Sequence, residues 1–169
     1  MRALRAEDES LYTHLYTDAE TMRFIGAPLS TARAAVSFRS ALAGMARTPI
    51  ERLFLAVVER ASSRAVGICS LQNFDPQRRS VQAGIMFIAA ARARGYSKEG
   101  FIGLISQVFA EFPVDELWVQ FAADHVAVQR AVTSVGFERR HTDAPQNEPE
   151  QLSLWVVRRD TWPLPARIY

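Results

Sequence analysis

The sequence predicts one α/β domain over residues 1–169, built on a mixed β-sheet. Apolar runs of strand length alternate along the chain with segments whose apolar residues recur at helical spacing. The clearest case is central: the apolar run 81–88 is followed by Phe101, Leu104, Ile105, Val108 and Phe112, which share one helix face. The 169 residues, 49% hydrophobic and 22% charged, suffice for one sizeable core. We expect a globular domain without internal repeats.

The amino-terminal third is expected to hold a short edge strand and two helices. Residues 1–5 predict the strand. Asp8 or Ser10 can begin the first helix, in which apolar side chains pair at helical spacing (Leu11 with Leu15, Tyr12 with Tyr16). Residues 18–30 predict a compact apolar turn. Ser30 or Thr31 can cap the second helix, which ends at Thr48-Pro49 and has these inward residues: Ala35, Phe38, Leu42 and Met45.

The rest of the chain predicts six strands and two helices. Residues 52–59 and 65–72 flank a polar turn and predict an antiparallel hairpin. The strand 81–88 and the central helix come next, followed by a strand at 116–122 and a helix at 126–135 that ends at Gly136. Two last strands, 137–141 and 152–157, flank the polar loop 142–150. The order is β-α-α-β-β-β-α-β-α-β-β, and residues 81–122 should form a right-handed parallel crossover.

Composition argues against several classes of protein. The net charge of +2 is too small to indicate nucleic-acid binding, and the arginines form no continuous basic tract. The amino terminus has no apolar segment of a signal peptide, and no window resembles a membrane span. Cys69 is the only cysteine, so it forms no internal disulfide; its place in an apolar strand indicates a small buried side chain. We therefore expect a cytoplasmic protein without a metal site.

A basic turn joins the central strand to the central helix and predicts a phosphate site. It reads Arg92-Ala93-Arg94-Gly95-Tyr96-Ser97-Lys98. The start of a helix presents free backbone N–H groups and the positive end of the helix dipole. Cations are unfavourable there unless an anion neutralises them, so the arginines indicate a bound phosphate. The alternative is an arginine-rich surface turn.

The pattern Arg92-x-x-Gly95-x-Ser97 resembles the pyrophosphate-binding signature of the GNAT N-acetyltransferase superfamily, Gln/Arg-x-x-Gly-x-Gly/Ala. Ser97 keeps a small residue where the family has Gly or Ala. The order of strands and helices also resembles the GNAT fold over nearly the whole chain. The resemblance implies a mostly antiparallel sheet whose central parallel pair splays apart, with helices on both faces.

The last helix resembles the bacterial RimJ/RimL-like branch, whose pattern is Asn-x-x-Ser-x-Arg-x-x-x-x-x-Gly-Phe. Arg130, Gly136 and Phe137 match it, whereas His125 and Val128 replace the Asn and Ser. Val132 stands where many GNAT enzymes carry a tyrosine that protonates the departing thiolate.

The resemblance implies acetyl-CoA as co-substrate and a set of residues that bind it. The pantetheine arm would lie between the splayed strands, against backbone groups of Met86, Phe87 and Ile88. The turn from Arg92 to Ser97 would hold the pyrophosphate through its backbone, with the following residues in the site: Arg92, Ala93, Arg94, Gly95, Tyr96, Ser97 and, from the last helix, Arg130.

The implied reaction is direct attack of a primary amine, at a protein amino terminus or on a small molecule, on the thioester. The amide of Ile88 or Phe87 would stabilise the oxyanion. His125 and then Asp124 are the candidate bases, although each could instead be structural and Asp124 could be a helix cap. Met22, Phe24 and Ile25 would contact the acceptor, framed also by the loop 142–150.

Three functions remain open at this point. The first is an N-acetyltransferase, active as a monomer or homodimer. The second is a catalytically silent GNAT-fold protein that binds acyl-CoA as a sensor, because His125, Val128 and Val132 each replace a polar group near the thioester. The third is an unrelated α/β binding domain in which the basic turn is coincidental.

Overall fold

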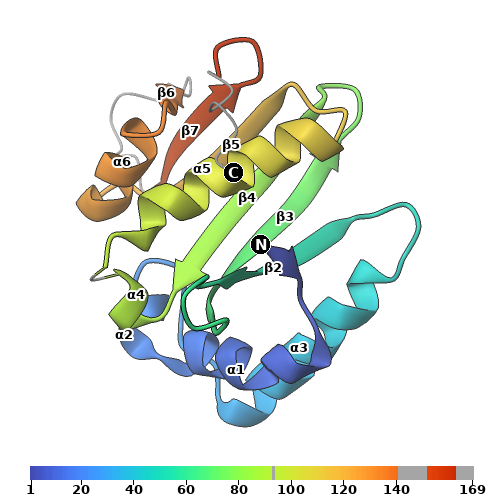
Figure 1. Ribbon diagram of the computed structural model, residues 1–169, viewed down its shortest axis with the longest axis vertical. Coiled ribbons are helices and arrows are strands. Elements are labelled where there is room, and N and C mark those ends of the chain that lie inside the picture. The colour runs from blue at the N-terminus through green and yellow to red at the C-terminus, as the bar shows by residue number, and fades with distance from the viewer. Residues whose placement is uncertain (93, 141–151, 163–169) are drawn as a thin grey trace.

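A seven-stranded sheet with helices on both faces forms the molecule, as the sequence predicts (Figure 1). The structure is a computed structural model and describes residues 1–92, 94–140 and 152–162. The strand order is β1-β2-β3-β4-β5-β7-β6, and every pair is antiparallel except β4 with β5. The strands are β1 (Arg2–Ala3), β2 (Arg52–Val58), β3 (Ala65–Asp75), β4 (Ser80–Phe87), β5 (Glu116–Ala122), β6 (Glu138–Arg140) and β7 (Leu152–Arg158).

One face of the sheet is covered by the amino-terminal helices α1 (Glu9–Thr17) and α3 (Thr31–Met45). Their core contacts Phe54, Ala56 and Ile68 of β2 and β3. The expected inward set of α3 is partly wrong: Ala34, Phe38 and Ala41 are the buried residues, and Ala35, Leu42 and Met45 are half-buried. The turn expected at 18–30 contains a short helix, α2 (Ala19–Met22), which Asp18 caps by accepting from the amide of Thr21.

The other face is covered by α5 (Tyr96–Glu111) and α6 (Val126–Thr133). The apolar residues predicted to share one face of the central helix all pack on it; Phe101, Leu104, Ile105 and Val108 are buried and Phe112, just past the helix end, is half-buried. Cys69 is fully buried in the same core, as expected, and burial raises the pKa of its thiol. Gly100 brings α5 close to β4, since a Cβ atom there would lie 2.7 Å from Phe87 and 2.8 Å from Ile85.

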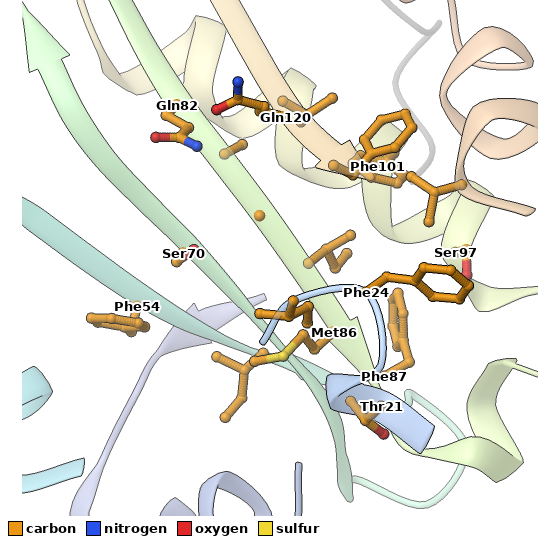
Figure 2. Close-up of a pocket in the computed structure, with 18 of the residues that line it drawn as sticks. Thr21, Phe24, Phe54, Ser70, Gln82, Met86, Phe87, Ser97, Phe101 and Gln120 are labelled. Atoms are coloured by element: carbon orange, nitrogen blue, oxygen red, sulfur yellow. The ribbon is translucent and has the colours of Figure 1, made fainter. Parts of the chain in front are cut away.

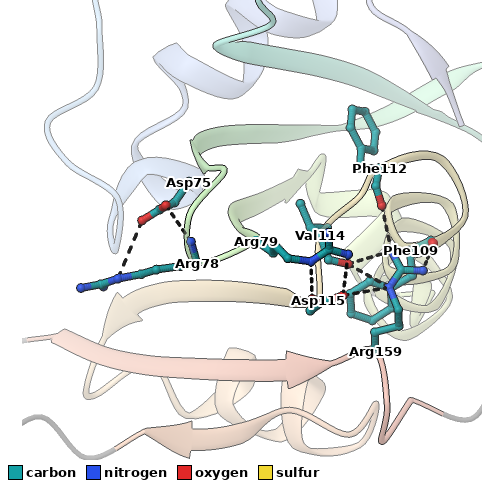
Figure 3. A network of polar contacts seen from close by, with 8 residues as sticks. All are labelled: Asp75, Arg78, Arg79, Phe109, Phe112, Val114, Asp115 and Arg159. Carbon is teal, nitrogen blue, oxygen red and sulfur yellow. Dashed lines mark hydrogen bonds and ion pairs between the residues drawn. The ribbon is translucent and has the colours of Figure 1, made fainter.

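The end of α5 is secured by one arginine from the far end of the chain (Figure 3). Arg159 follows β7 and donates to the carbonyl of Phe112 at 2.8 Å, to that of Val114 at 2.7 and 2.9 Å, and to that of Phe109. Its guanidinium also lies over the Phe109 ring, and Asp115 pairs with both Arg159 and Arg79. The carbonyls that a helix end leaves without partners thus receive charged donors.

The two parallel strands separate after a short stretch of pairing. β4 and β5 pair only over Ser80–Gln82 and Glu116–Trp118, although β4 continues to Phe87 and β5 to Ala122. From Ala83 onward β4 has a partner on one side alone, because β3 still pairs with it as far as Phe87. This separation, which the GNAT resemblance implied, opens the middle of the sheet.

Candidate active site

A cavity of about 930 Å³ passes through the sheet at this opening (Figure 2). All residues of β4 from Gln82 to Phe87 line it, as do Val119, Gln120 and Phe121 of β5. Consecutive residues of a strand point to opposite faces, so a cavity that they all line follows the strand edge and reaches both faces. On the α5/α6 face it meets Phe101, Val128 and Ala131; on the α1/α3 face it meets side chains of α1, α3, β2 and β3.

The exposed edge of β4 offers backbone groups to a ligand in the cavity. The amide of Ile88 donates to the carbonyl of Val66 at 3.0 Å. The direction of backbone hydrogen bonding alternates along an antiparallel strand, so the N–H and C=O groups of Met86 and Gly84 also point toward β3. The backbone groups of the residues between them point toward β5; these residues are Ala83, Ile85 and Phe87. Of the expected backbone contacts, Phe87 is therefore available, whereas the amide of Ile88 already has a partner.

The basic turn and the start of α5 form one end of the cavity. Gly95 adopts the left-handed conformation with φ 77°, which glycine reaches without strain. The amides of Arg92, Arg94 and Gly95 already donate to carbonyls of residues 88–92, and no side chain caps α5. The unpaired amides of a helix start belong to its first residues, here Tyr96, Ser97 and Lys98. Arg92, Gly95, Ser97 and Lys98 line the cavity; Ala93 lies outside the described residues.

The side chains of Arg94 and Tyr96, two residues of the expected phosphate turn, both contact Glu59. Arg94 forms an ion pair with Glu59, and the hydroxyl of Tyr96 donates to the same carboxylate. Hydrogen bonds from Ser62 and Tyr96, with help from Arg94, lower the pKa of Glu59. Neither Arg94 nor Tyr96 lines the cavity, so their side chains attach the turn to the β2–β3 hairpin.

Arg92 connects the turn to the amino-terminal segment. Its guanidinium donates to the hydroxyl of Thr21 at 3.2 Å, and Thr21 in turn donates to Asp18. These hydrogen bonds from Thr21 lower the pKa of Asp18. Beside them, Phe24 and Ile25 line the cavity as the sequence analysis expected, but Met22 is buried outside it.

Of the two candidate bases, His125 is the one that lines the cavity. It occupies the position before α6, and its ring stacks on Phe24 at 4.0 Å between centroids. Burial lowers the pKa of His125, and Arg23 and Arg92 lower it further against the opposing effect of Asp124. Asp124 is exposed, does not line the cavity and is not the cap of α6. The structure thus separates the two candidates.

The remaining expected residues of α6 differ in position. Val128 lines the cavity, whereas Arg130 is exposed away from its lining and Val132 is fully buried in the core. The loop 142–150 and residues 163–169 lie outside the described residues.

Sequence reasoning missed the polar residues on the α1/α3 face of the cavity. They are Arg52, Ser70, Gln72, Gln82 and Gln120, with Tyr16, Ser37 and Ser40 from the helices. Part of the signal was present in the sequence, because Ser70, Gln82 and Gln120 each stand between two apolar residues. Only the register of the strands shows that they share one face.

Comparison with known proteins places the fold in a family. A family model described as an acetyltransferase (GNAT) domain matches residues 1–138. The chain belongs to the GNAT acetyltransferase family. The expected membership is therefore confirmed. No curated protein matches this GNAT chain in sequence.

Solved structures share the GNAT fold at low sequence identity. Spermidine N-acetyltransferase from Vibrio cholerae, in complex with CoA and spermine, is 13% identical with a TM-score of 0.78, covering 94% of each chain. RimL, the ribosomal L7/L12 alpha-N-protein acetyltransferase in complex with CoA, is 10% identical with a TM-score of 0.76, covering 93% of this chain and 92% of its own. Aminoglycoside acetyltransferase AAC(6')-Ib, in complex with CoA, is 13% identical with a TM-score of 0.75, covering 94% of each chain.

Within residues 1–92, 94–140 and 152–162, no group of His, Cys, Asp and Glu side chains could hold a metal ion. None of the helices in that part of the chain is long and apolar enough to span a membrane.

Proposed function

We propose that this GNAT protein is an N-acetyltransferase that moves the acetyl group of acetyl-CoA to a primary amine. One observation carries the proposal: the cavity passes through the sheet where β4 and β5 separate, with the start of α5 at one end. A pyrophosphate at Tyr96, Ser97 and Lys98 would place the pantetheine arm against the free backbone of β4. The structurally similar RimL and aminoglycoside acetyltransferase were each solved with CoA.

The cofactor and the acceptor would bind on opposite faces of the sheet. The α5/α6 side of the cavity is apolar and basic and suits the cofactor, whereas the α1/α3 side carries neutral polar groups together with Arg52 and suits the acceptor. The thioester would then lie at the opening, beside Gly84 and Ile85. The amide of Phe87 or Ile85, which faces the gap, can donate to the oxyanion.

Direct transfer forms a bond between the amine nitrogen and the acyl carbon and breaks the bond from that carbon to sulfur. Acetyl-CoA supplies the activated acyl group. The amine loses a proton and the thiolate gains one. His125 can accept the amine proton, because its lowered pKa keeps the imidazole neutral near pH 7. Phe24 fixes the imidazole plane by stacking on it.

A catalytically silent acyl-CoA-binding protein is the second candidate. The part of α6 that faces the cavity consists of Ala127, Val128 and Ala131, none of which can protonate a thiolate. Binding without turnover would follow if no other group or water delivers that proton. Product formation separates the two candidates, since both require acetyl-CoA binding.

The first test compares thermal stability with and without acetyl-CoA in wild type, Gly95→Trp and Gly136→Trp. Both glycines have positive φ (77° and 88°), so both variants carry the same kind of backbone strain, but only Gly95 lines the cavity. Ligand at a hundred times its dissociation constant should add about 2.7 kcal/mol to wild type and to Gly136→Trp. Gly95→Trp should lose that increment. If wild type shows no increment, the assignment of acetyl-CoA is wrong.

A further inference from the structure

The α1/α3 side of the cavity contains an arginine whose role neither the reaction nor the cofactor explains. Arg52 is the first residue of β2 and lines the cavity. No ion pair or hydrogen bond joins its side chain to any residue within the described parts of the chain. Two other cations line the cavity: Arg92 ends the short helix α4 (Ala89–Arg92) and donates to Thr21, and Lys98 lies in the first turn of α5.

Strand register places Arg52 among neutral hydrogen-bonding groups. Arg52 pairs with Gln72, and Gln72 pairs with Gln82, so the three side chains form one row across β2, β3 and β4. The next row along the strands is Phe54, Ser70 and Gly84. Phe54 packs against α1 and α3, which puts both rows on the face opposite α5.

Among the described residues, this face offers no counter-charge for a cationic acceptor. No Asp or Glu of the described residues lines the cavity, whereas Arg52, Arg92 and Lys98 do. A polyamine would bring several positive charges into this lining without a carboxylate to receive them, which costs free energy. The same positive surroundings lower the pKa of a single amine and so favour its reactive neutral form.

We propose that the acceptor is an amine that also carries an anionic group, carboxylate or phosphate, and that Arg52 binds this group. The inference rests on the proposed function, because it places the reacting amine at the β4–β5 opening beside Gly84. In sheet geometry the Cα atom of Arg52 lies two strands and two residues from that of Gly84, about 12 Å away. Both residues lie on the same face, so an anionic group bound above Arg52 leaves room for several bonds between it and an amine beside Gly84.

The guanidinium of Arg52 and the neighbouring glutamines can together bind an anionic group. An arginine presents two parallel N–H groups to a carboxylate or phosphate, and Gln72 and Gln82 can donate to the remaining oxygens. Asn73 already donates to the side-chain oxygen of Gln82 at 2.6 Å, which leaves the Gln82 amide nitrogen as a donor. Free amino acids, amino phosphates and peptides with an acidic residue near the amino terminus share the required chemistry.

The test measures acetylation of ω-amino acids from glycine to 6-aminohexanoate, their uncharged amides, 2-aminoethyl phosphate, peptides with an acidic or neutral second residue, and spermidine. Wild type should prefer the anionic member of each pair. The series of chain lengths and the peptides then show whether a small molecule or a peptide is the better acceptor. Arg52→Gln should lower kcat/KM for anionic amines about 10-fold to 100-fold and leave the amides unchanged. Arg39→Gln, an exposed arginine of α3 outside the cavity, is the matched control and should change neither.

A binding measurement keeps this inference separate from the proposed function. Titration of the same amines into the CoA-bound protein, followed by thermal stability, needs no turnover. Anion-dependent binding that Arg52→Gln removes supports the acceptor site even if no product forms, in which case the transferase proposal fails alone. Equal binding or turnover of anionic and neutral amines, or a preference for spermidine, overturns the inference.

Discussion

Close packing of α5 on β4 at Gly100 should control both stability and cofactor binding. Gly100→Ala places a methyl group 2.7 Å from Phe87 and 2.8 Å from Ile85, whereas in Gly103→Ala the nearest atom is Met1 Cε at 3.6 Å. Both changes lie in α5 and replace glycine with a better helix former, a gain of about 1 kcal/mol. In Gly100→Ala that gain opposes an overpacking cost of about 1–3 kcal/mol.

The two variants should therefore differ by about 2 kcal/mol in the free energy of unfolding, or by about 4–8 °C in Tm, with Gly103→Ala the more stable. Thermal and urea denaturation measure this difference. Because Ile85 and Phe87 border the β4–β5 opening, calorimetric titration should also show weaker acetyl-CoA binding to Gly100→Ala alone. Equal stability and equal affinity of the two variants would refute the argument that this contact positions β4.

Three other predictions concern single side chains. Arg159→Met should lower the free energy of unfolding by about 2–3 kcal/mol, because carbonyls at the end of α5 lose charged donors; an unchanged urea midpoint would contradict this. Asp8 is buried and accepts from Arg2 at 2.7 and 2.9 Å and from the Arg5 amide at 2.8 Å. Burial by itself would raise the pKa of Asp8, but these bonds lower it below 3.8, so their stabilisation is present above about pH 4 and lost as pH falls through the folded-state pKa. Asp8→Asn should cost about 2–3 kcal/mol at pH 7 and flatten the acid side of the stability profile; an unaltered profile counts against the pairing. His125→Gln should lower kcat about 100-fold and keep the acetyl-CoA thermal increment, and the wild-type rate should fall only at acidic pH; a rate unaffected by the change would exclude His125 as the base.

The order of elements follows from local sequence, and the reasons are visible at particular residues. Apolar spacing from Phe101 to Val108 predicts one buried helix face, and these residues are buried. Residues 18–30 were predicted to form a turn, but they contain a short helix, because Asp18 caps its start. The inward face of α3 was misplaced by one position at Ala34 and Ala35, since alanine gives little hydrophobic signal to distinguish adjacent faces of a helix.

By itself, the sequence determined that a strand leads through a glycine turn into a helix, and it predicted a phosphate site at Gly95 and Ser97. Those properties depend on residues a few positions apart. Tertiary structure alone decided that Arg94 binds Glu59, 35 residues earlier in the chain, and that His125 reaches the cavity while Asp124 does not. It also aligned Arg52, Gln72 and Gln82 in one row. Strand register and long-range packing set these contacts, and neither is encoded in the spacing of neighbouring residues.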